Sequence, residues 1–334
     1  MFYSKILISV TEICTVGCRH CGFTGSIRER QPAPGEIADW VTQACDFGIG
    51  TIIFTGGEPF QRFSLLKAGV NAAASHQAKP DIACFTSSFW GKDPRTVGKF
   101  LDQLQGMTHL YLSTDVYHQE QVPAQYVRNV IDGALARDIT GLSLCITIGK
   151  DSEEQQIRSL YADYGEQLLV KVDKVISSPH IDPVATTRHT PEPRNFAPHC
   201  FLHTPIVNPN GDLCACHAAK VGAHHPLERD VYVLGNLKEK SFKEIMDEAD
   251  GNYSYQFLRA YGPQGVARLV NEDSVLRERF GPQLFSNGCD LCSRVLLTRR
   301  GRQALAEHAD DDFNRMLIDA VRATRFGEVR EAAI

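Results

Sequence analysis

The chain has 334 residues, of which 43% are hydrophobic and 22% are charged, and its formal net charge is −5. This composition is typical of a folded protein of about two domains and excludes a disordered chain. The acidic balance disfavours a general nucleic-acid binder, and no apolar run approaches the ~18 residues that span a bilayer. The N-terminal segment lacks a signal-peptide cleavage site, so we expect a first strand there and a cytoplasmic protein.

Short apolar runs alternate with amphipathic stretches through the first half of the chain. The apolar runs are rich in branched residues and predict buried parallel strands over 6–10, 51–55, 81–86, 109–113, 142–148 and 168–176. The stretches between them predict helices over 35–47, 63–76, 93–104, 123–137 and 152–164. This alternation implies an α/β fold with a parallel sheet, open or curled into a barrel, and an active site at the C-terminal strand ends.

The alternation stops near residue 177. Seven prolines between 177 and 209 exclude a helix or a central strand there, and we interpret this segment as a domain junction. The loop-rich module that follows contains a predicted hairpin from 206 and a helix over 241–249, where Ser241 and Glu244 fit a capping box. The tail from 294 to 334 predicts charged helices, and we interpret its arginines at 294, 299, 300 and 302 as a solvated face and not as a phosphate site.

Eleven cysteines are distributed unevenly along the chain. Most lie in three close groups: Cys14, Cys18 and Cys21; Cys200, Cys214 and Cys216; Cys289 and Cys292. Because no secretory signal is present, such groups indicate metal ligands and not disulfides. The single Cys45, Cys84 and Cys145 are expected as core residues, with a role as hydrogen-atom donor as the alternative for one of them.

The first cysteine group follows the first predicted strand directly. Structural zinc sites and the clusters of simple electron carriers take four ligands, so the three thiolates of Cys14, Cys18 and Cys21 leave one metal position open. A zinc loop completed by His20 or by a distant cysteine is the alternative.

A second motif, Gly56-Gly57-Glu58, ends the second predicted strand. Two glycines let the backbone approach a ligand closely, and the carboxylate can receive an ammonium group. Alone, this motif would indicate only a turn. Here the motif follows the three cysteines by one βα unit, and the combination of the two motifs is a much more specific signal of a binding site than either motif alone.

Together the two motifs resemble the signatures of the radical S-adenosylmethionine (SAM) superfamily. The resemblance implies a partial (β/α)6 barrel over residues 1–185, in which Cys14, Cys18 and Cys21 hold a [4Fe–4S] cluster whose open iron is chelated by SAM. It further implies reductive cleavage of SAM to a 5′-deoxyadenosyl radical that abstracts a substrate hydrogen atom. A flavodoxin- or ferredoxin-type electron donor would serve this cluster.

The resemblance also implies contacts to SAM. Gly56, Gly57 and Glu58 align with the loop that receives the SAM amino group, and His20, just before the third cysteine, is expected near the adenine. The other candidates follow the third and fourth strands and are Ser87, Ser113 and Asp115.

Histidines are also expected on the catalytic rim. His118 follows the fourth predicted strand and is our candidate for substrate contact or proton transfer. A second group, His180 with Asp182, follows the sixth strand. A structural or solvated histidine is the alternative in each case.

The second half resembles the "twitch" module, a shortened relative of the SPASM domain, expected over 186–300 and followed by a helical tail over 301–334. The resemblance implies one auxiliary [4Fe–4S] cluster, with no open iron, on Cys200, Cys216, Cys289 and Cys292. The spacing from Gly211 favours Cys216, but Cys214 stays open as the ligand in its place. Zinc on the same four cysteines is the alternative.

An auxiliary cluster of this kind can accept an electron, so we expect oxidation of a C–H or C–OH centre in a small molecule. Among relatives, the four-cysteine twitch resembles that of an aminocyclitol alcohol dehydrogenase from antibiotic biosynthesis. One alternative is an enzyme that crosslinks or epimerises a ribosomal peptide, although an N-terminal peptide-recognition domain is not evident before the first strand. The others are an activator of a partner enzyme and a non-catalytic zinc or electron-transfer protein.

Overall fold

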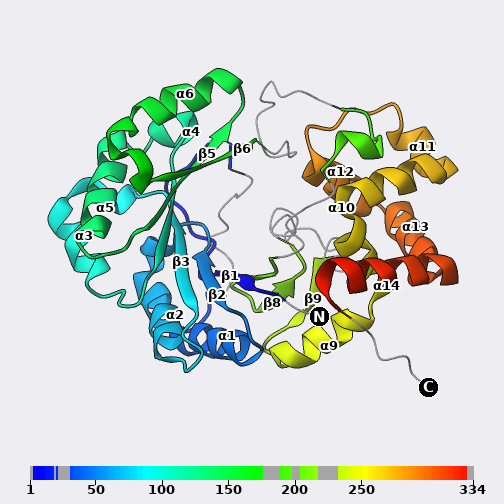
Figure 1. The fold of residues 1–334 in the computed structure, drawn as a ribbon, viewed down its shortest axis with the longest axis horizontal. Coiled ribbons are helices and arrows are strands. Elements are labelled where there is room, and N and C mark those ends of the chain that lie inside the picture. The colour runs from blue at the N-terminus through cyan, green and yellow to red at the C-terminus, as the bar shows by residue number, and fades with distance from the viewer. Residues whose placement is uncertain are drawn as a thin grey trace. The chain divides into compact units, whose positions relative to one another are not determined.

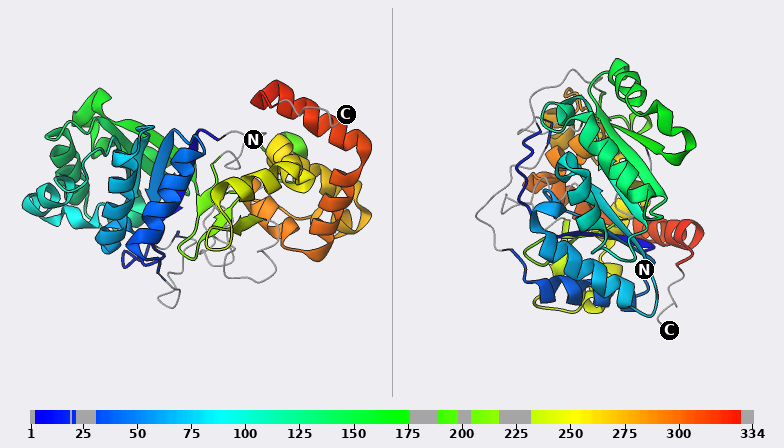
Figure 2. Two further views of the ribbon diagram at one scale, coloured as in Figure 1. Left: turned by 90° about the horizontal axis from the view of Figure 1, so that it is seen from below. Right: turned by 90° about the vertical axis from the view of Figure 1, so that its left-hand side faces the viewer.

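The computed structural model describes residues 3–18, 20–21, 31–175, 189–197, 204–216 and 232–328 (Figures 1 and 2). The chain divides into two compact units. The barrel unit comprises Ser4–Thr186 and Val207–Gly211, and the C-terminal unit comprises Met1–Tyr3, Thr187–Ile206 and Asp212–Ile334. Among the described residues, none of the helices combines the length and apolar character that crossing a membrane requires.

The barrel unit is built on six parallel strands in the order β6-β5-β4-β3-β2-β1. The strands are β1 (Lys5–Ser9), β2 (Thr51–Thr55), β3 (Asp81–Thr86), β4 (His109–Ser113), β5 (Gly141–Ile148) and β6 (Leu169–Lys174). All six predicted strands are confirmed, within two residues at each end. In Figure 1 the sheet curves, as expected of a partial barrel, and its helices lie along the outer side.

The helices of this unit alternate with the strands. They are α1 (Pro34–Asp46), α2 (Phe63–Ser75), α3 (Pro94–Leu101), α4 (Val116–Gln119), α5 (Ala124–Leu135) and α6 (Asp151–Ser159). Short 3₁₀ turns are η1 (Pro59–Arg62), η2 (Phe89–Lys92) and η3 (Ala162–Gln167). The four-residue α4 escaped prediction because it is too short for a helical hydrophobic period.

The strand sequences explain why the sheet is covered on one side. Along β4, Leu110 and Leu112 are fully buried, whereas His109, Tyr111 and Ser113 alternate with them and are half-buried. Successive strand side chains point to opposite faces, so the leucines pack in the core and the polar set faces the other way. The polar set therefore lines the side of the sheet that the helices leave uncovered.

The C-terminal unit contains a small hairpin and a group of helices. Strand β8 (Asp212–Cys214) pairs antiparallel with β9 (Val233–Asn236). The short strand β7 (Ile206–Val207) lies at the boundary of the two units and precedes the Asn-Gly turn, which belongs to the barrel unit. The helices are α9 (Phe242–Gly251), α10 (Tyr253–Glu272), α11 (Ser274–Phe280), α12 (Gly288–Leu296), α13 (Arg299–Asp310) and α14 (Asp312–Phe326), with a turn η4 (Pro193–Asn195). The capping box of Ser241 and Glu244 at the start of α9 is confirmed.

Helix α10 was not predicted, since we expected a loop-rich module there. It is buried on most of its surface and kinks at Gly262, whose φ is +53°, just before Pro263. A helix buried all round has no polar face, so its sequence lacks the amphipathic period that a sequence analysis detects.

The tail helices α13 and α14 pack with α10 within the C-terminal unit (Figure 2). A buried ion pair between Arg259 and Glu328 joins α10 to the end of the tail, with guanidinium–carboxylate distances of 3.0 Å. Our interpretation of Arg294, Arg299, Arg300 and Arg302 as a solvated face is wrong for three of them. Arg294 is half-buried and donates to the carbonyl oxygen of Leu284 at 3.2 Å. Arg300 pairs with Asp273, and Arg302 donates to the last carbonyls of α12.

Candidate active site

The three cysteines after β1 lie together on one loop of the barrel unit. The backbone N–H of Cys21 donates to the carbonyl oxygen of Cys18 at 3.1 Å, and all three side chains are half-buried. Burial raises the pKa of the Cys14 and Cys18 thiols, and the neighbouring cysteines and carboxylates raise it further. Three thiols that oppose one another's ionisation fit a cationic group shared between them, so this donor set suits an iron–sulfur cluster.

The two glycines after β2 pack against the backbone that leads into the cysteine loop. A Cβ on Gly56 would lie 2.4 Å from the carbonyl oxygen of Thr11, and one on Gly57 would lie 2.3 Å from that of Ile13. The N–H of Gly57 donates to the Thr11 carbonyl at 2.7 Å, and the N–H of Glu58 donates to the Ile13 carbonyl at 2.9 Å. The glycines therefore join the end of β2 to the segment before Cys14.

The Glu58 side chain is buried and extensively hydrogen-bonded. Its Oε1 accepts from the Phe60 N–H at 3.1 Å and from the Thr86 hydroxyl at 2.9 Å. Its Oε2 accepts from the N–H of Ser87 at 2.8 Å and from the Ser87 hydroxyl at 2.6 Å. Burial raises the pKa of this carboxyl, although these hydrogen bonds oppose the increase.

Sequence reasoning missed Thr86, which organises the end of β3. Its Oγ1 accepts from the indole N–H of Trp90 at 2.9 Å and from the N–H of Ser88 at 3.1 Å, while it donates to Glu58. Ser88 is fully buried in the left-handed region at φ +63°, and its hydroxyl has no partner in the described parts of the chain. The run Thr86-Ser87-Ser88 at a strand end was the available signal.

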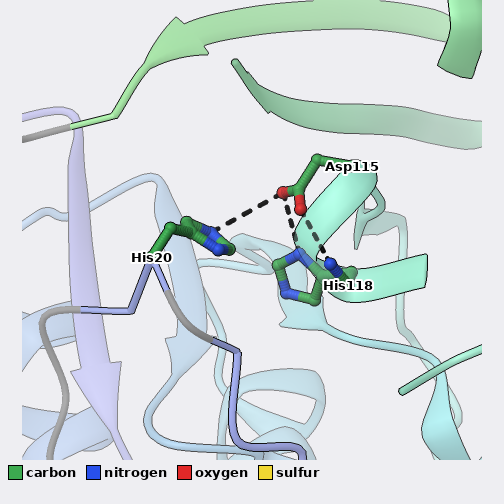
Figure 3. A group of neighbouring side chains, drawn as sticks. All are labelled: His20, Asp115 and His118. Atoms are coloured by element: carbon green, nitrogen blue, oxygen red, sulfur yellow. Dashed lines mark hydrogen bonds and ion pairs between the residues drawn. The ribbon is translucent and has the colours of Figure 1, made fainter. Parts of the chain in front are cut away.

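His20, Asp115 and His118 form one group above the strand ends (Figure 3). Asp115, directly after β4, is 1% exposed and caps α4 by accepting from the N–H groups of Tyr117 and His118. Its Oδ2 lies 2.8 Å from Nδ1 of His118 and 3.6 Å from Nε2 of His20. The His20 ring also lies 4.7 Å from that of Tyr117, measured between centroids.

The ionisation of this group follows from its burial. Burial raises the pKa of the Asp115 carboxyl, but the hydrogen bond from His118, together with the positive charge that each histidine carries when it is protonated, lowers this pKa below the usual range. Burial lowers the pKa of His20, which is therefore a neutral imidazole near pH 7. The His20 Nδ1 is buried without a partner among the described residues.

Two histidines and a carboxylate can bind a transition metal, so the contact distances matter. Two ligands that are each about 2.1 Å from a tetrahedral zinc ion lie about 3.4 Å apart. The 2.8 Å separation of Asp115 and His118 is instead that of a hydrogen bond. An ionised carboxylate only accepts, so Nδ1 of His118 carries a proton, and in the neutral form of the ring Nε2 is the acceptor.

The remaining predicted SAM contacts are placed at the same strand ends. Ser87 bonds Glu58, whereas Ser113 is half-buried on β4 and lies opposite Cys145 in the register with β5. The charge of Glu58 raises the pKa of Cys14, and that of Asp115 raises the pKa of Cys18. The cysteine loop, the glycine motif and the histidine group therefore lie within electrostatic reach of one another.

The single cysteines differ in their access. Cys45 and Cys84 are buried, as expected of core residues. Cys145 is half-buried on β5, and burial raises the pKa of its thiol to about 12, an increase that Lys171 opposes. His180 and Asp182 lie outside the described residues.

Three of the four predicted auxiliary ligands are described, all in the C-terminal unit. Cys216 is buried just after β8, and Cys289 and Cys292 are half-buried one turn apart on α12. Cys214 is also buried, on β8 itself, with its Sγ 3.9 Å from the carbonyl oxygen of Asp212. Cys200 lies outside the described residues, so the ligand set stays a prediction.

Two family patterns match the chain. The Radical SAM superfamily matches residues 8–142, and the SPASM iron–sulfur cluster-binding domain matches residues 200–263. The first range holds the three-cysteine loop and the glycine motif, and the second holds Cys200, Cys214 and Cys216.

Two curated proteins are similar to this chain. The putative peptide biosynthesis protein YydG of Bacillus subtilis is 22% identical over 310 residues, which cover 88% of this chain and 92% of the relative. GTP 3′,8-cyclase of Listeria welshimeri is 26% identical over 150 residues, covering 42% of this chain and 43% of the relative.

Solved structures share the fold at low sequence identity. The structure of anSMEcpe with bound AdoMet and the Cp18Cys peptide is 12% identical, with a TM-score of 0.56 over 96% of this chain and 99% of that one. The structure of BtrN with AdoMet and 2-DOIA is 12% identical, with a TM-score of 0.50 over 79% of this chain and 89% of that one. Both support the expected fold, a partial barrel followed by a smaller domain.

Proposed function

Because the chain contains a Radical SAM domain followed by a SPASM iron–sulfur cluster-binding domain, we propose that it modifies a peptide by radical SAM chemistry. The observation that carries the peptide substrate is the similarity to YydG, which extends over 88% of this chain and 92% of the relative. Similarity over nearly the whole of both chains includes both domains and not the SAM-binding part alone.

The peptide replaces the small molecule that the sequence led us to expect. That expectation depended on the four-cysteine pattern of the second domain, which does not distinguish between substrates. BtrN supports the fold alone, because it is 12% identical to this chain. The match to YydG covers 88% of this chain, whereas the match to GTP 3′,8-cyclase, whose name indicates a small-molecule substrate, covers 42%.

In this proposal Cys14, Cys18 and Cys21 hold the SAM-binding [4Fe–4S] cluster. The half-buried thiols of this loop, whose pKa values at Cys14 and Cys18 are raised by burial and by the neighbouring cysteines, support that assignment. When bound, the cluster and SAM supply the radical that takes a hydrogen atom from the substrate. Gly56 and Gly57 fix the loop against the end of β2, so the protein supplies a rigid frame for the cysteines.

His118 is the proton acceptor in this proposal, held in place by Asp115. The carboxylate accepts the Nδ1 proton and leaves Nε2 available on a side chain that is partly exposed. Asp115 is itself fixed by two backbone N–H groups, so the ring has one preferred orientation. A reaction that removes a proton from the substrate after hydrogen abstraction would use this nitrogen.

Cys216, Cys289 and Cys292, together with Cys200, hold the auxiliary [4Fe–4S] cluster in this proposal. The match of residues 200–263 to an iron–sulfur cluster-binding domain supports a cluster over structural zinc. Four thiolates would leave it no open position, so its role is electron transfer or structure and not SAM binding.

The test uses short peptides encoded beside the gene. Anaerobically reconstituted protein with SAM and a reductant should convert one such peptide to a product of altered mass or altered retention at unchanged mass. A matched reaction with the Cys14→Ala, Cys18→Ala and Cys21→Ala triple variant should leave the peptide intact. Conversion of an aminocyclitol, with every peptide left unchanged, would refute the proposed substrate class.

A further inference from the structure

We propose that Glu58 is a positioning residue that braces β2 against β3, and that its carboxylate does not contact the amino group of SAM. A carboxylate has about four lone-pair positions for hydrogen bonds. In this structure four donors from three residues fill them: Phe60, Thr86 and Ser87, the last through both its N–H and its hydroxyl. The expected contact with an ammonium group therefore has no unused acceptor position at Glu58.

Three of the four donors cannot turn away easily to admit a ligand, and the fourth, the Ser87 hydroxyl, has Glu58 as its partner. Two are backbone N–H groups, whose directions are fixed by the chain. The Thr86 hydroxyl is held by Trp90 and by the N–H of Ser88. Because Glu58 is 1% exposed, displacing any donor would leave a buried polar group unpaired.

The backbone N–H groups of Gly57 and Glu58 are directed toward the cysteine loop, away from the Glu58 carboxylate and β3. The N–H groups of Gly57 and Glu58 bind the carbonyl oxygens of Thr11 and Ile13, the residues just before Cys14. Glu58 thus connects three strand ends: β2 by its own position, β3 by its side chain, and the cysteine loop after β1 by its N–H. A shift of its carboxylate would move both the loop and the end of β3.

The inference depends on the SAM-binding part of the proposed function, so the test measures ligand binding and not activity. The probes are S-adenosylhomocysteine and the analogue that lacks its amino group, each titrated anaerobically into the cluster-loaded protein without reductant. If Glu58 is a brace, Glu58→Gln should weaken both ligands by the same factor, about 10-fold. The affinity ratio of the two ligands should then stay within twofold of the wild-type ratio.

Two results would overturn the brace. One is a selective loss, in which Glu58→Gln weakens only the amine-bearing ligand. The other is unchanged affinity for both ligands. A wild-type protein that binds neither ligand would instead contradict the proposed function, so the two failures are distinguishable.

Ser87→Ala provides the second variant, because it removes one donor and keeps the carboxylate. The brace predicts an equal loss for both ligands, and little further loss when Glu58→Gln is added to Ser87→Ala. Additive losses, or a Ser87→Ala variant that loses affinity for the amine-bearing ligand alone, would contradict it. Iron content and circular dichroism of each variant control for loss of the cluster and of the fold. If Glu58→Gln does not fold, the affinity ratio of the two ligands in Ser87→Ala decides the question alone.

Discussion

Asp115 accepts the Nδ1 proton of His118 at 2.8 Å with one carboxylate oxygen, while its other oxygen caps the helix that carries His118. The pair is therefore fixed by the same turn of chain that follows β4. This arrangement orients an imidazole at the C-terminal edge of a parallel sheet, where α/β proteins place their active sites. The first prediction concerns this pair.

His118→Ala should lower the rate of peptide modification by about 100-fold or more if Nε2 accepts a substrate proton. Cluster content and SAM binding should stay near wild type, because the side chain is not among the predicted cluster ligands. His76→Ala is the matched control, since His76 also pairs with an aspartate, Asp46, at 3.0 Å, but on the surface. Equal product formation by both variants would remove His118 from the mechanism.

The second prediction concerns the cysteine loop. Reconstituted wild-type protein should contain about eight irons, four in each cluster. The Cys14→Ala, Cys18→Ala and Cys21→Ala triple variant should retain about four irons and lose all SAM cleavage, measured as 5′-deoxyadenosine. Stoichiometric zinc without iron–sulfur absorption in the wild type would contradict both cluster assignments.

The third prediction tests the packing of the glycine motif. Gly57→Ala should destabilise the protein by about 1–3 kcal/mol, since its Cβ would lie 2.3 Å from the Ile13 carbonyl oxygen. Gly35→Ala in α1 is the control, because its Cβ would meet nothing within 4 Å. Chemical unfolding of the cluster-free proteins gives the comparison. Equal stability of the two variants would show that the segment adjusts without cost.

The fourth prediction follows from the raised pKa of Glu58, which is caused first by burial and is opposed by its hydrogen bonds. A carboxyl whose folded pKa exceeds the unfolded value of about 4.3 contributes most stability at low pH and loses it as pH rises through the folded pKa. The unfolding free energy of wild type relative to Glu58→Gln should therefore fall as pH rises from about 4.5. If the unfolding free energy of wild type relative to Glu58→Gln instead increased with pH, the folded-state pKa of Glu58 would be lowered and not raised.

The fifth prediction concerns the auxiliary cluster. Cys289→Ala with Cys292→Ala should remove about four irons and leave SAM cleavage measurable, because the proposed SAM-cluster ligands belong to the barrel unit. Cys216→Ala should behave in the same way, and Cys214→Ala should have little effect. Circular dichroism must accompany each variant. If Cys214→Ala loses iron and Cys216→Ala does not, Cys214 and not Cys216 is the ligand of the auxiliary cluster.

The barrel could be predicted from the sequence because its strands are continuous apolar runs with a helical period between them. Helix α10 could not, since its burial on most sides removes the polar face that marks a surface helix. The site divides in a similar way. The cysteine and glycine motifs are local in sequence, whereas the contacts from Thr86 and Ser87 to Glu58 span 28 and 29 positions and arise only when β2 and β3 pair.

The most direct measurement of the central claim is SAM cleavage as a function of added peptide. Reconstituted protein with reductant should form 5′-deoxyadenosine slowly alone and faster with one short peptide encoded beside the gene, in proportion to modified peptide detected by mass spectrometry and chromatography. If an aminocyclitol accelerates 5′-deoxyadenosine formation and the peptides do not, the proposed peptide substrate is wrong.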